Sequence, residues 1–191
     1  YDGGSGFPSN VDLSGFDTAT GLGVITVTTA GDGTHTVLGF FDHEIDENSN
    51  TFFNEYGATG GAPAAGETWE IDEPGFSFGD IYTHFKAMAL DNTNAVPSPQ
   101  PDDVSMAIGR GGFSLTGGQT GTVVMKVTQT EPSSGFYLIQ TDPDSSASIY
   151  LQSSLTIRDT GTPAPEFPAP AAPLAIIGIM FAAVAVFRKD R

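Results

Sequence analysis

Short apolar segments separated by Gly, Pro, Asn and Asp recur through residues 1–160, and this pattern constrains the fold most. In its clearest instance, at 148–157, four apolar side chains fall on one face of a strand and polar ones on the other: Ile149, Leu151, Leu155 and Ile157. Other strand-like segments occupy 22–29, 35–41, 68–72, 104–108, 122–128 and 135–141. Turn residues at such short intervals are typical of antiparallel strands, not of βαβ units. The sequence therefore predicts a mainly β protein, an antiparallel β-sandwich with one short helix.

The remaining segments carry further local signals. Residues 31–33, Gly-Asp-Gly, predict a hairpin turn between two neighbouring strands. An aromatic strand is expected at 51–56, and the small residues at 57–66 are typical of a loop. The one helical pattern lies at 80–90, where Asp80 precedes apolar residues at helical spacing.

Composition divides the chain into three parts. Residues 1–160 are long enough for one domain with its own core, and no linker interrupts them. A Pro-rich spacer follows at 161–173, and a hydrophobic helix with a basic end is expected at 174–191. The chain contains no cysteine, so no disulfide holds the fold. Because the chain begins at Tyr1, we expect a signal peptide to have been removed and the domain to be extracellular.

The apolar stretch near the C-terminus predicts a helix that is shielded from water. No charged residue occurs from 174 to 187, and the basic end 188–191 follows. Such a helix would be roughly 21 Å long, compared with a hydrocarbon core of about 30 Å. Basic residues on this side alone predict a cytoplasmic end and an external domain. The alternative is packing with copies of itself into a filament core, because apolar side chains surround the helix, among them Leu174, Ile177, Phe181 and Val184.

This tail resembles the C-terminal sorting signals called PEP-CTERM, and more closely the archaeal variant PEF-CTERM. The matching parts stand in order, with Pro165, Glu166 and Phe167 followed by the apolar helix and the basic end. In those families, membrane transpeptidases called exosortases or archaeosortases cut near the tripeptide and transfer the protein to an anchor. The resemblance covers residues 165–191 and implies a protein held at the cell surface.

Parts of the preceding domain resemble the ectodomains of PEP-CTERM proteins. The matching stretches include Phe-Phe-Asp-His-Glu-Ile-Asp-Glu at 40–47 and Trp-Glu-Ile-Asp-Glu-Pro-Gly at 69–75. Residues 101–107 and 136–145 belong to the same resemblance. It implies a secreted surface protein, and no functional residue is carried over from it.

The formal net charge of −16 excludes some classes of partner. Residues 1–160 contain only four cationic side chains, Lys86, Arg110, Lys126 and Arg158. The domain is therefore not expected to bind nucleic acid or anionic lipid head groups, which attract Lys and Arg. Divalent cations are the natural partners of so acidic a surface.

The candidate Ca²⁺ site is a row of carboxylates at 42–47. Asp42, Glu44 and Asp46 alternate, so on a strand they would share a face at spacings of roughly 6.6 Å, and Glu47 adjoins them. Ca²⁺ takes about six to eight oxygen ligands and would relieve their repulsion. The segment does not fit an EF-hand, so further ligands would come from separate loops, such as Glu55, Asp72, Asp102 or Asp142. The alternative is a solvated acidic face.

No catalytic residues are predicted. Residues 75–79, Gly-Phe-Ser-Phe-Gly, match the Gly-x-Ser-x-Gly elbow, but that motif belongs to a parallel sheet and requires an acid and then a His after the Ser. The only His after Ser77 is His84. No zinc cluster is expected, because His35, His43 and His84 fall on different elements. A glycosidase uses a pair of carboxylates, and the number of Asp and Glu residues in this chain does not exclude such a pair.

Two functions remain open. The first is a non-enzymatic extracellular structural protein, anchored at the surface or assembled with copies of itself into a filament or biofilm matrix. The second is a calcium-dependent adhesin or carbohydrate-binding module. In the first, the tail's partners are the membrane, a sorting transpeptidase or other copies of the chain.

Overall fold

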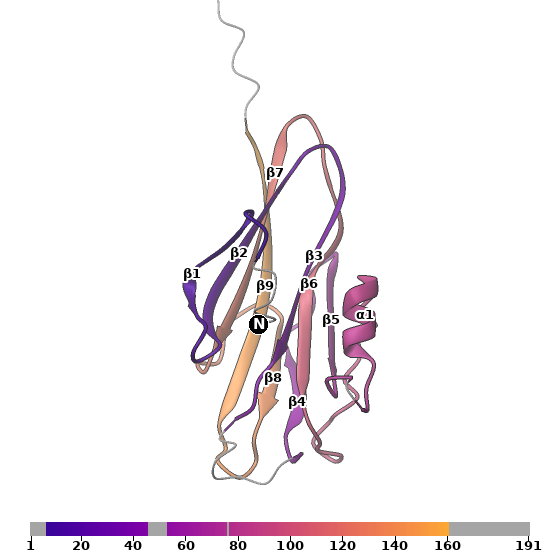
Figure 1. The fold of residues 1–191 in the computed structure, drawn as a ribbon, viewed down its shortest axis with the longest axis vertical. Helices are drawn as coiled ribbons and strands as arrows, with labels where there is room; N and C mark the ends of the chain where they lie inside the picture. The colour runs from indigo at the N-terminus through magenta and orange to yellow at the C-terminus, as the bar shows by residue number, and fades with distance from the viewer. Residues whose placement is uncertain (1–6, 46–52, 76, 161–191) are drawn as a thin grey trace, which may run out of the picture. The chain divides into compact units, whose positions relative to one another are not determined.

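The computed structural model describes residues 7–45, 53–75 and 77–160 (Figure 1). The chain divides into two units, Tyr1–Thr160 and Gly161–Arg191, and every described residue belongs to the first. Several predictions lie outside the described residues: the spacer 161–173, the helix 174–191, Asp46, Glu47, Pro165, Glu166, Phe167, Leu174, Ile177, Phe181 and Val184.

One antiparallel sheet contains six strands in the order β1-β2-β7-β9-β8-β4. The strands are β1 Val11–Asp17, β2 Leu22–Ala30, β4 Tyr56–Gly60, β7 Gln119–Thr128, β8 Tyr137–Thr141 and β9 Ser148–Asp159. The alternation predicted for β9 is confirmed at Ile149 and Leu151, which are buried. Near the end of the strand, however, Ile157 is 42% exposed.

A second antiparallel sheet contains three strands in the order β3-β6-β5. They are β3 Gly33–Asp42, β5 Glu67–Asp72 and β6 Ser105–Leu115. The two sheets pack face to face over one core (Figure 1). The six-stranded sheet contributes Val123, Met125, Val127, Leu138 and Leu151 to this core, and the three-stranded sheet contributes Ile71, Met106, Ile108 and Leu115. The prediction of a mainly β protein with antiparallel sheets is confirmed.

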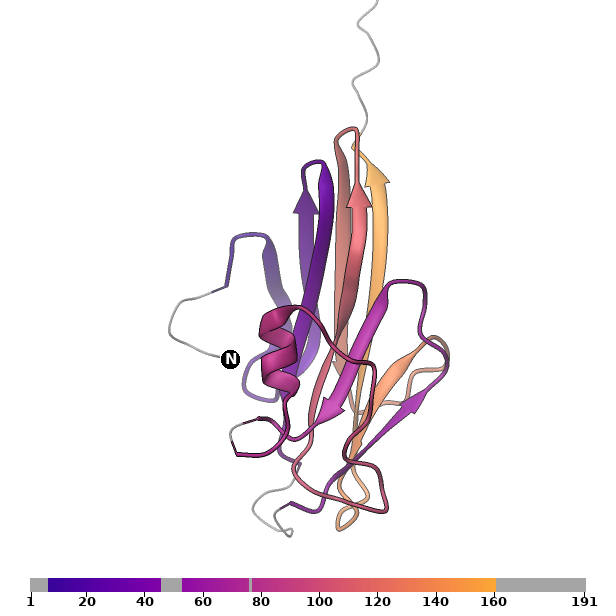
Figure 2. The same cartoon turned by 90° about the vertical axis from the view of Figure 1, so that its right-hand side faces the viewer.

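Helix α1, Ile81–Ala87, covers the outer face of the three-stranded sheet (Figure 2). Ile81 is fully buried there, beside Ala107 of β6. The predicted helix at 80–90 is present but shorter. It ends because Met88 adopts a left-handed conformation with φ of 55°, from which its N–H bonds the carbonyl of Phe85.

Residues 92–97 form a strap that closes one side of the sandwich. Its backbone pairs with β5, where Ile71 N–H donates to Thr93 O at 3.0 Å and Ala95 N–H donates to Ile71 O at 2.9 Å. It also pairs with β4 of the other sheet, where Gly57 N–H donates to Val96 O at 2.7 Å. The strap therefore satisfies edge groups of both sheets and links them.

The hairpin predicted at 31–33 is wrong. β2 pairs with β1 and β7, whereas β3 pairs with β6, so this turn connects the two sheets. Both strands contribute side chains to the core between the sheets, β2 through Ile25 and Val27 and β3 through Val37 and Phe41.

Strands β1 and β4 were not predicted. β4 occupies part of the loop expected at 57–66. The strand expected at 51–56 shares only Tyr56 with β4, and residues 51 and 52 lie outside the described residues. The small residues of β4 have a packing reason. A Cβ at Gly57 would collide with the side chain of Ile71, and one at Gly60 with the ring of Tyr137.

Two glycines on β6 provide a test of the packing between β3 and β6. A Cβ at Gly109 would collide with Val37 O and lie 2.7 Å from Leu38 Cα, whereas a Cβ at Gly111 would meet Thr68 Cγ2 at an ordinary 3.5 Å. We expect Gly109→Ala to lower the free energy of unfolding by about 2 kcal/mol or more. Gly111→Ala should change it by less than about 1 kcal/mol. Urea denaturation measures both, and equal effects would contradict the close approach.

Candidate functional site

The connection between β5 and β6, residues 73–104, carries the candidate site. The two strands are antiparallel neighbours, and such strands are usually joined by about two to five residues. This longer connection contains α1 and the strap, and α1 lies on the outer face of the three-stranded sheet, where it contacts β3, β6 and β5 (Figure 2). Long connections are a common location for binding sites.

Glu70 is a buried carboxylate on the face of β5 that α1 covers. The pleat of the strand directs Ile71 into the core and Glu70 to the opposite face, where its side chain is 1% exposed. Glu70 Oε1 accepts a hydrogen bond from His84 Nδ1 at 2.9 Å, and Oε2 accepts one from Asp91 N–H at 3.2 Å. Burial raises the pKa of Glu70, and these two hydrogen bonds counteract part of the rise.

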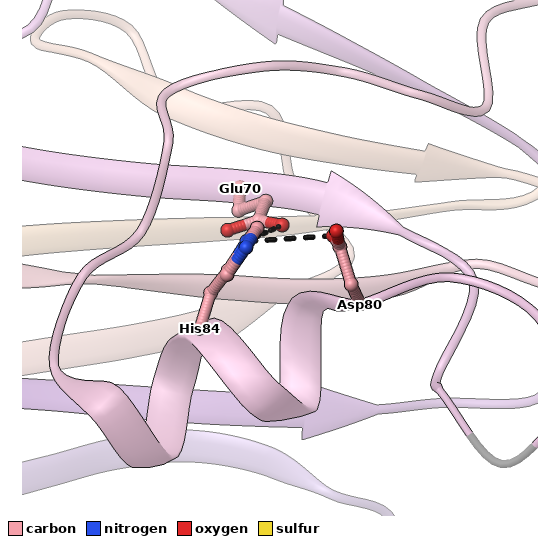
Figure 3. Close-up of side chains that lie close together, drawn as sticks. All are labelled: Glu70, Asp80 and His84. Carbon is pink, nitrogen blue, oxygen red and sulfur yellow. Dashed lines mark hydrogen bonds and ion pairs between the residues drawn. The ribbon is translucent and has the colours of Figure 1, made fainter.

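Asp80 and His84 lie one helical turn apart, and both side chains point toward Glu70 (Figure 3). Asp80 occupies the N-cap position of α1, but its side chain makes no capping hydrogen bond. Instead, its Oδ1 lies 3.4 Å from His84 Nδ1. The hydrogen bond to Glu70 raises the pKa of His84, and the charges of Glu70, Asp80 and Asp91 raise it further.

Three metal-ligating atoms converge at this point. One ligand atom each from Glu70, Asp80 and His84 lies within 4.8 Å of the other two. Among residues 7–45, 53–75 and 77–160, this is the one set of three His, Asp or Glu side chains with that geometry. The Asp80 side chain is 63% exposed, so solvent reaches the group from one side. Chemically, the group can share a proton between His84 and Glu70, or it can hold one metal ion.

The same connection contributes to an aromatic cluster formed by Phe40, Tyr82 and Phe85. The Phe40 ring lies 5.6 Å from the Tyr82 ring and 5.8 Å from the Phe85 ring, measured between centroids. Lys86 Nζ lies 4.6 Å from the Tyr82 centroid, within cation–π range. Tyr82 is 41% exposed, and Phe78, in the turn before α1, is 72% exposed. Both side chains are therefore accessible from solvent.

Carboxylates from separate segments gather at the end of the sandwich where β3 and β5 end and β6 begins. Asp42 and Asp72 both pair with Ser105, and Glu55 forms a β-bridge with Asp102. We call this group the acidic end: Asp42, Glu55, Asp72, Asp102, Asp103 and Asp142. The separate-loop residues suggested from the sequence are thus brought to one end of the domain, although no three of the described carboxylates there approach as closely as the group at α1.

Glu55 is the most strongly perturbed member of the acidic end. It is 4% exposed, and its carboxylate accepts hydrogen bonds from Ile45 N–H at 3.0 Å and from Gln140 Nε2. Burial raises the pKa of Glu55 from 4.5 to about 7, the two hydrogen bonds oppose the rise, and the charges of Asp103 and Asp142 add to it. Burial likewise raises the pKa of Asp103, with a further contribution from the charges of Asp42 and Asp102.

The carboxylate row predicted at 42–47 is only partly described. β3 ends at Asp42, so the alternating strand on which that prediction rests does not continue to Glu44. Asp42 accepts a hydrogen bond from Ser105 Oγ at 2.6 Å, and Glu44 is exposed. Asp46 and Glu47 lie outside the described residues. Calcium binding by this segment stays a prediction.

A group of one histidine and two carboxylates was not predicted from the sequence. The three histidines do lie apart, but His84 meets Glu70 and Asp80. Asp80 and His84 are four residues apart on a predicted helix, and this spacing indicates that their side chains are neighbours. No signal identified Glu70 as their neighbour. The pattern at 75–79 lies between antiparallel strands, which is not the setting of a nucleophile elbow.

Comparisons with protein families, with curated proteins and with solved structures yield no match to this chain. Its chemistry is therefore inferred from its own residues. Within the described part of the chain, no helix has the length and apolar character needed to cross a membrane.

The raised pKa of Glu55 predicts a pH-dependent stability. The folded state binds the proton of the Glu55 carboxyl more tightly than the unfolded chain does. The stability that this proton contributes is therefore lost as pH rises from 4.5 to about 7. Glu55→Gln has no carboxyl to titrate at this position, so the variant does not lose this stability as pH rises. We expect the stability of the variant, relative to the parent, to rise by up to about 3 kcal/mol between pH 4 and pH 8.

Urea denaturation across this pH range measures the effect. Asp32→Asn is the control for the change in net charge, because Asp32 is exposed in the turn between β2 and β3. Parallel pH profiles of the parent and Glu55→Gln would show that Glu55 titrates normally.

Proposed function

We propose that this chain is a non-enzymatic extracellular structural protein whose β-sandwich is tethered, or assembled with other copies, through residues 161–191. The observation that carries the proposal is the position of β9, the last strand before the tail. β9 lies between β7 and β8 inside the six-stranded sheet. Its pairing with β7 is unbroken, from Tyr150 opposite Thr128 to Asp159 opposite Gln119.

This position suits a strand that bears load. Force applied after Thr160 would act along β9 and would have to shear its long ladder with β7 as a whole. The side chains of Leu151, Val123 and Val127 add buried apolar contacts to that ladder. β8 pairs with β9 only at residues 148–151, so the ladder with β7 alone holds the C-terminal part of β9. The geometry therefore favours a domain that stays folded while its C-terminus is held.

The C-terminal end of β9 and the acidic end lie at opposite ends of the sandwich. β9 ends at Asp159 beside Gln119, at the end of the domain where the turn at Asp32 approaches Gly118. The acidic end lies at the other end of the strands, next to Ser105 and Thr141 (Figure 1). The domain therefore ends, at Thr160, on the side opposite the acidic end.

The tail sequence supplies the other half of the proposal. Its apolar side chains, Leu174, Ile177, Phe181 and Val184, suit either a membrane or a bundle of identical tails. Its resemblance to PEF-CTERM signals, through Pro165, Glu166 and Phe167, adds a sorting transpeptidase as a transient partner.

Removing the tail tests this function. A chain ending at Thr160 should keep the circular-dichroism spectrum and the unfolding transition of the domain, because the described core lies within residues 7–160. It should also be released quantitatively into the medium, whereas the full chain stays with cells or sediments as an assembly. The single substitution Ile177→Asp is the matched variant, since a charge in an apolar helix opposes both insertion and bundling. Continued retention of the truncated domain on cells would refute the tethering role of the tail.

The alternative function is a calcium-dependent adhesin or carbohydrate-binding module. It is favoured by the exposed aromatic side chains Phe78 and Tyr82, the second of which lies beside Lys86, and by the convergence of carboxylates at the acidic end. Aromatic rings can stack on the apolar faces of sugars, and Ca²⁺ can be ligated by carboxylates from several loops.

Retention on insoluble polysaccharide, measured in millimolar Ca²⁺ and in EDTA, tests the alternative. If it holds, Phe78→Ala and Tyr82→Ala should weaken retention several-fold. Ile157→Ala, which removes an exposed apolar side chain from β9, should leave it unchanged. Equal retention of all variants would exclude the aromatic surface, and equal retention in EDTA would exclude calcium.

A further inference from the structure

We propose that Glu70, Asp80 and His84 bind one divalent transition-metal ion of the Zn²⁺ class between α1 and β5. None of its three side chains belongs to the tail or to the acidic end, although Asp72 of the acidic end accepts a hydrogen bond from Asp80 N–H at 2.7 Å. It uses one imidazole nitrogen and two carboxylate oxygens, each from a side chain that already points to a common centre (Figure 3).

Two separations between the ligand atoms can be compared with those around a small metal ion. Zn²⁺ binds His nitrogen and carboxylate oxygen at about 2.0–2.2 Å, so neighbouring ligands of a tetrahedral site lie about 3.4 Å apart. His84 Nδ1 lies 3.4 Å from Asp80 Oδ1 and 2.9 Å from Glu70 Oε1. The first separation already fits, and the second requires the Glu70 and His84 atoms to part by roughly 0.5 Å.

The position of Asp80 points the same way. A helix-start Asp normally accepts a hydrogen bond from the first turn, which stabilises the helix by about 1 kcal/mol. Asp80 makes no such bond, and its carboxylate faces His84 instead. His84 Nδ1 has one hydrogen to donate and is already bonded to Glu70 at the shorter distance. A metal ion would engage all three side chains at once.

The net negative charge around His84 also favours binding of a cation. Glu70, Asp80 and Asp91 surround His84, so even a protonated imidazole leaves an excess of negative charge. The charged groups that perturb Glu70 are His84 and Asp91, with no Lys or Arg among them in the described part of the chain. A divalent ion would compensate the buried Glu70 carboxylate more fully than the imidazolium does.

The donor set selects the class of metal. Imidazole with carboxylates suits Zn²⁺ and its neighbours in the transition series, whereas Ca²⁺ prefers about six to eight oxygen ligands. The exposed side of Asp80 leaves room for water as a fourth ligand. On binding, an imidazolium loses its Nδ1 proton to solvent, whereas a neutral ring moves that proton to Nε2; in both cases Nδ1 then donates its lone pair to the metal. The ion would then join α1 to β5 and fix the helix that presents Tyr82.

Titration of the full chain with Zn²⁺ tests the site. The protein is stripped with EDTA, exchanged into chelator-free buffer and kept in millimolar Ca²⁺ and Mg²⁺ to occupy dispersed surface carboxylates. We expect one saturable Zn²⁺ equivalent by calorimetry and a higher melting temperature, since the ion binds the folded state. Co²⁺ in place of Zn²⁺ should give the visible absorption of a low-coordinate site with a nitrogen ligand.

Two variants and one control make the outcome decisive. Asp80→Asn keeps the bond between His84 and Glu70 and should weaken Zn²⁺ binding at least about tenfold. His84→Gln should abolish the one-equivalent step. The control His35→Gln removes a histidine on β3 whose Nε2 faces Gly31 O, and it should bind Zn²⁺ like the parent. If His84→Gln fails to fold, Asp80→Asn alone decides. Absence of saturable binding, or unchanged affinity in Asp80→Asn, would overturn the proposal.

Discussion

The burial of β6 on both faces is the constraint on which the rest of this structure depends. Its first six residues, 105–110, are all buried. Met106 and Ile108 pack into the core between the sheets, while Ala107 faces the opposite side, where Ile81 covers it. A strand of this kind at the centre of a three-stranded sheet needs a third layer, because its outer face would otherwise expose apolar surface. Helix α1 provides that layer, and the long connection between β5 and β6 exists to place it.

Covering this face also brings polar groups out of water, and each buried charge has an identifiable partner. Glu70 accepts hydrogen bonds from His84 and Asp91, and Glu55 accepts them from Ile45 and Gln140. Between the sheets, Arg110 lies 3.1 Å from Glu67 and donates to Ser153 O at 3.0 Å. Such partners add little net stability, but removing one of them leaves an uncompensated charge. Glu55 belongs to the acidic end, so at least one carboxylate there is held by such partners.

The strands with strong patterns were predicted from the sequence, and the weak ones were not. β2, β5, β7 and β9 combine β-branched or alternating apolar residues with turn residues at their ends, and these signals are local. β4 carries the opposite signal, since Gly57 and Gly60 disfavour a strand. It forms because β8 pairs with it and because Ile71 and Tyr137 occupy the space that larger side chains would need. The turn at 31–33 was assigned correctly as a turn, but which sheet each flanking strand joins depends on distant partners.

The sequence alone determined the mainly β class, the existence of a short helix near Asp80, the scarcity of cations and the apolar tail. These properties depend on composition and on side-chain period, which are local. Only the tertiary structure decided that Glu70 lies under His84, that Glu55 is buried among carboxylates, and that β9 sits inside its sheet. Each of these depends on contacts between residues far apart in the chain. The physical reason is that periodicity specifies which face of an element is buried, whereas the layer that covers that face is selected by packing among all the elements.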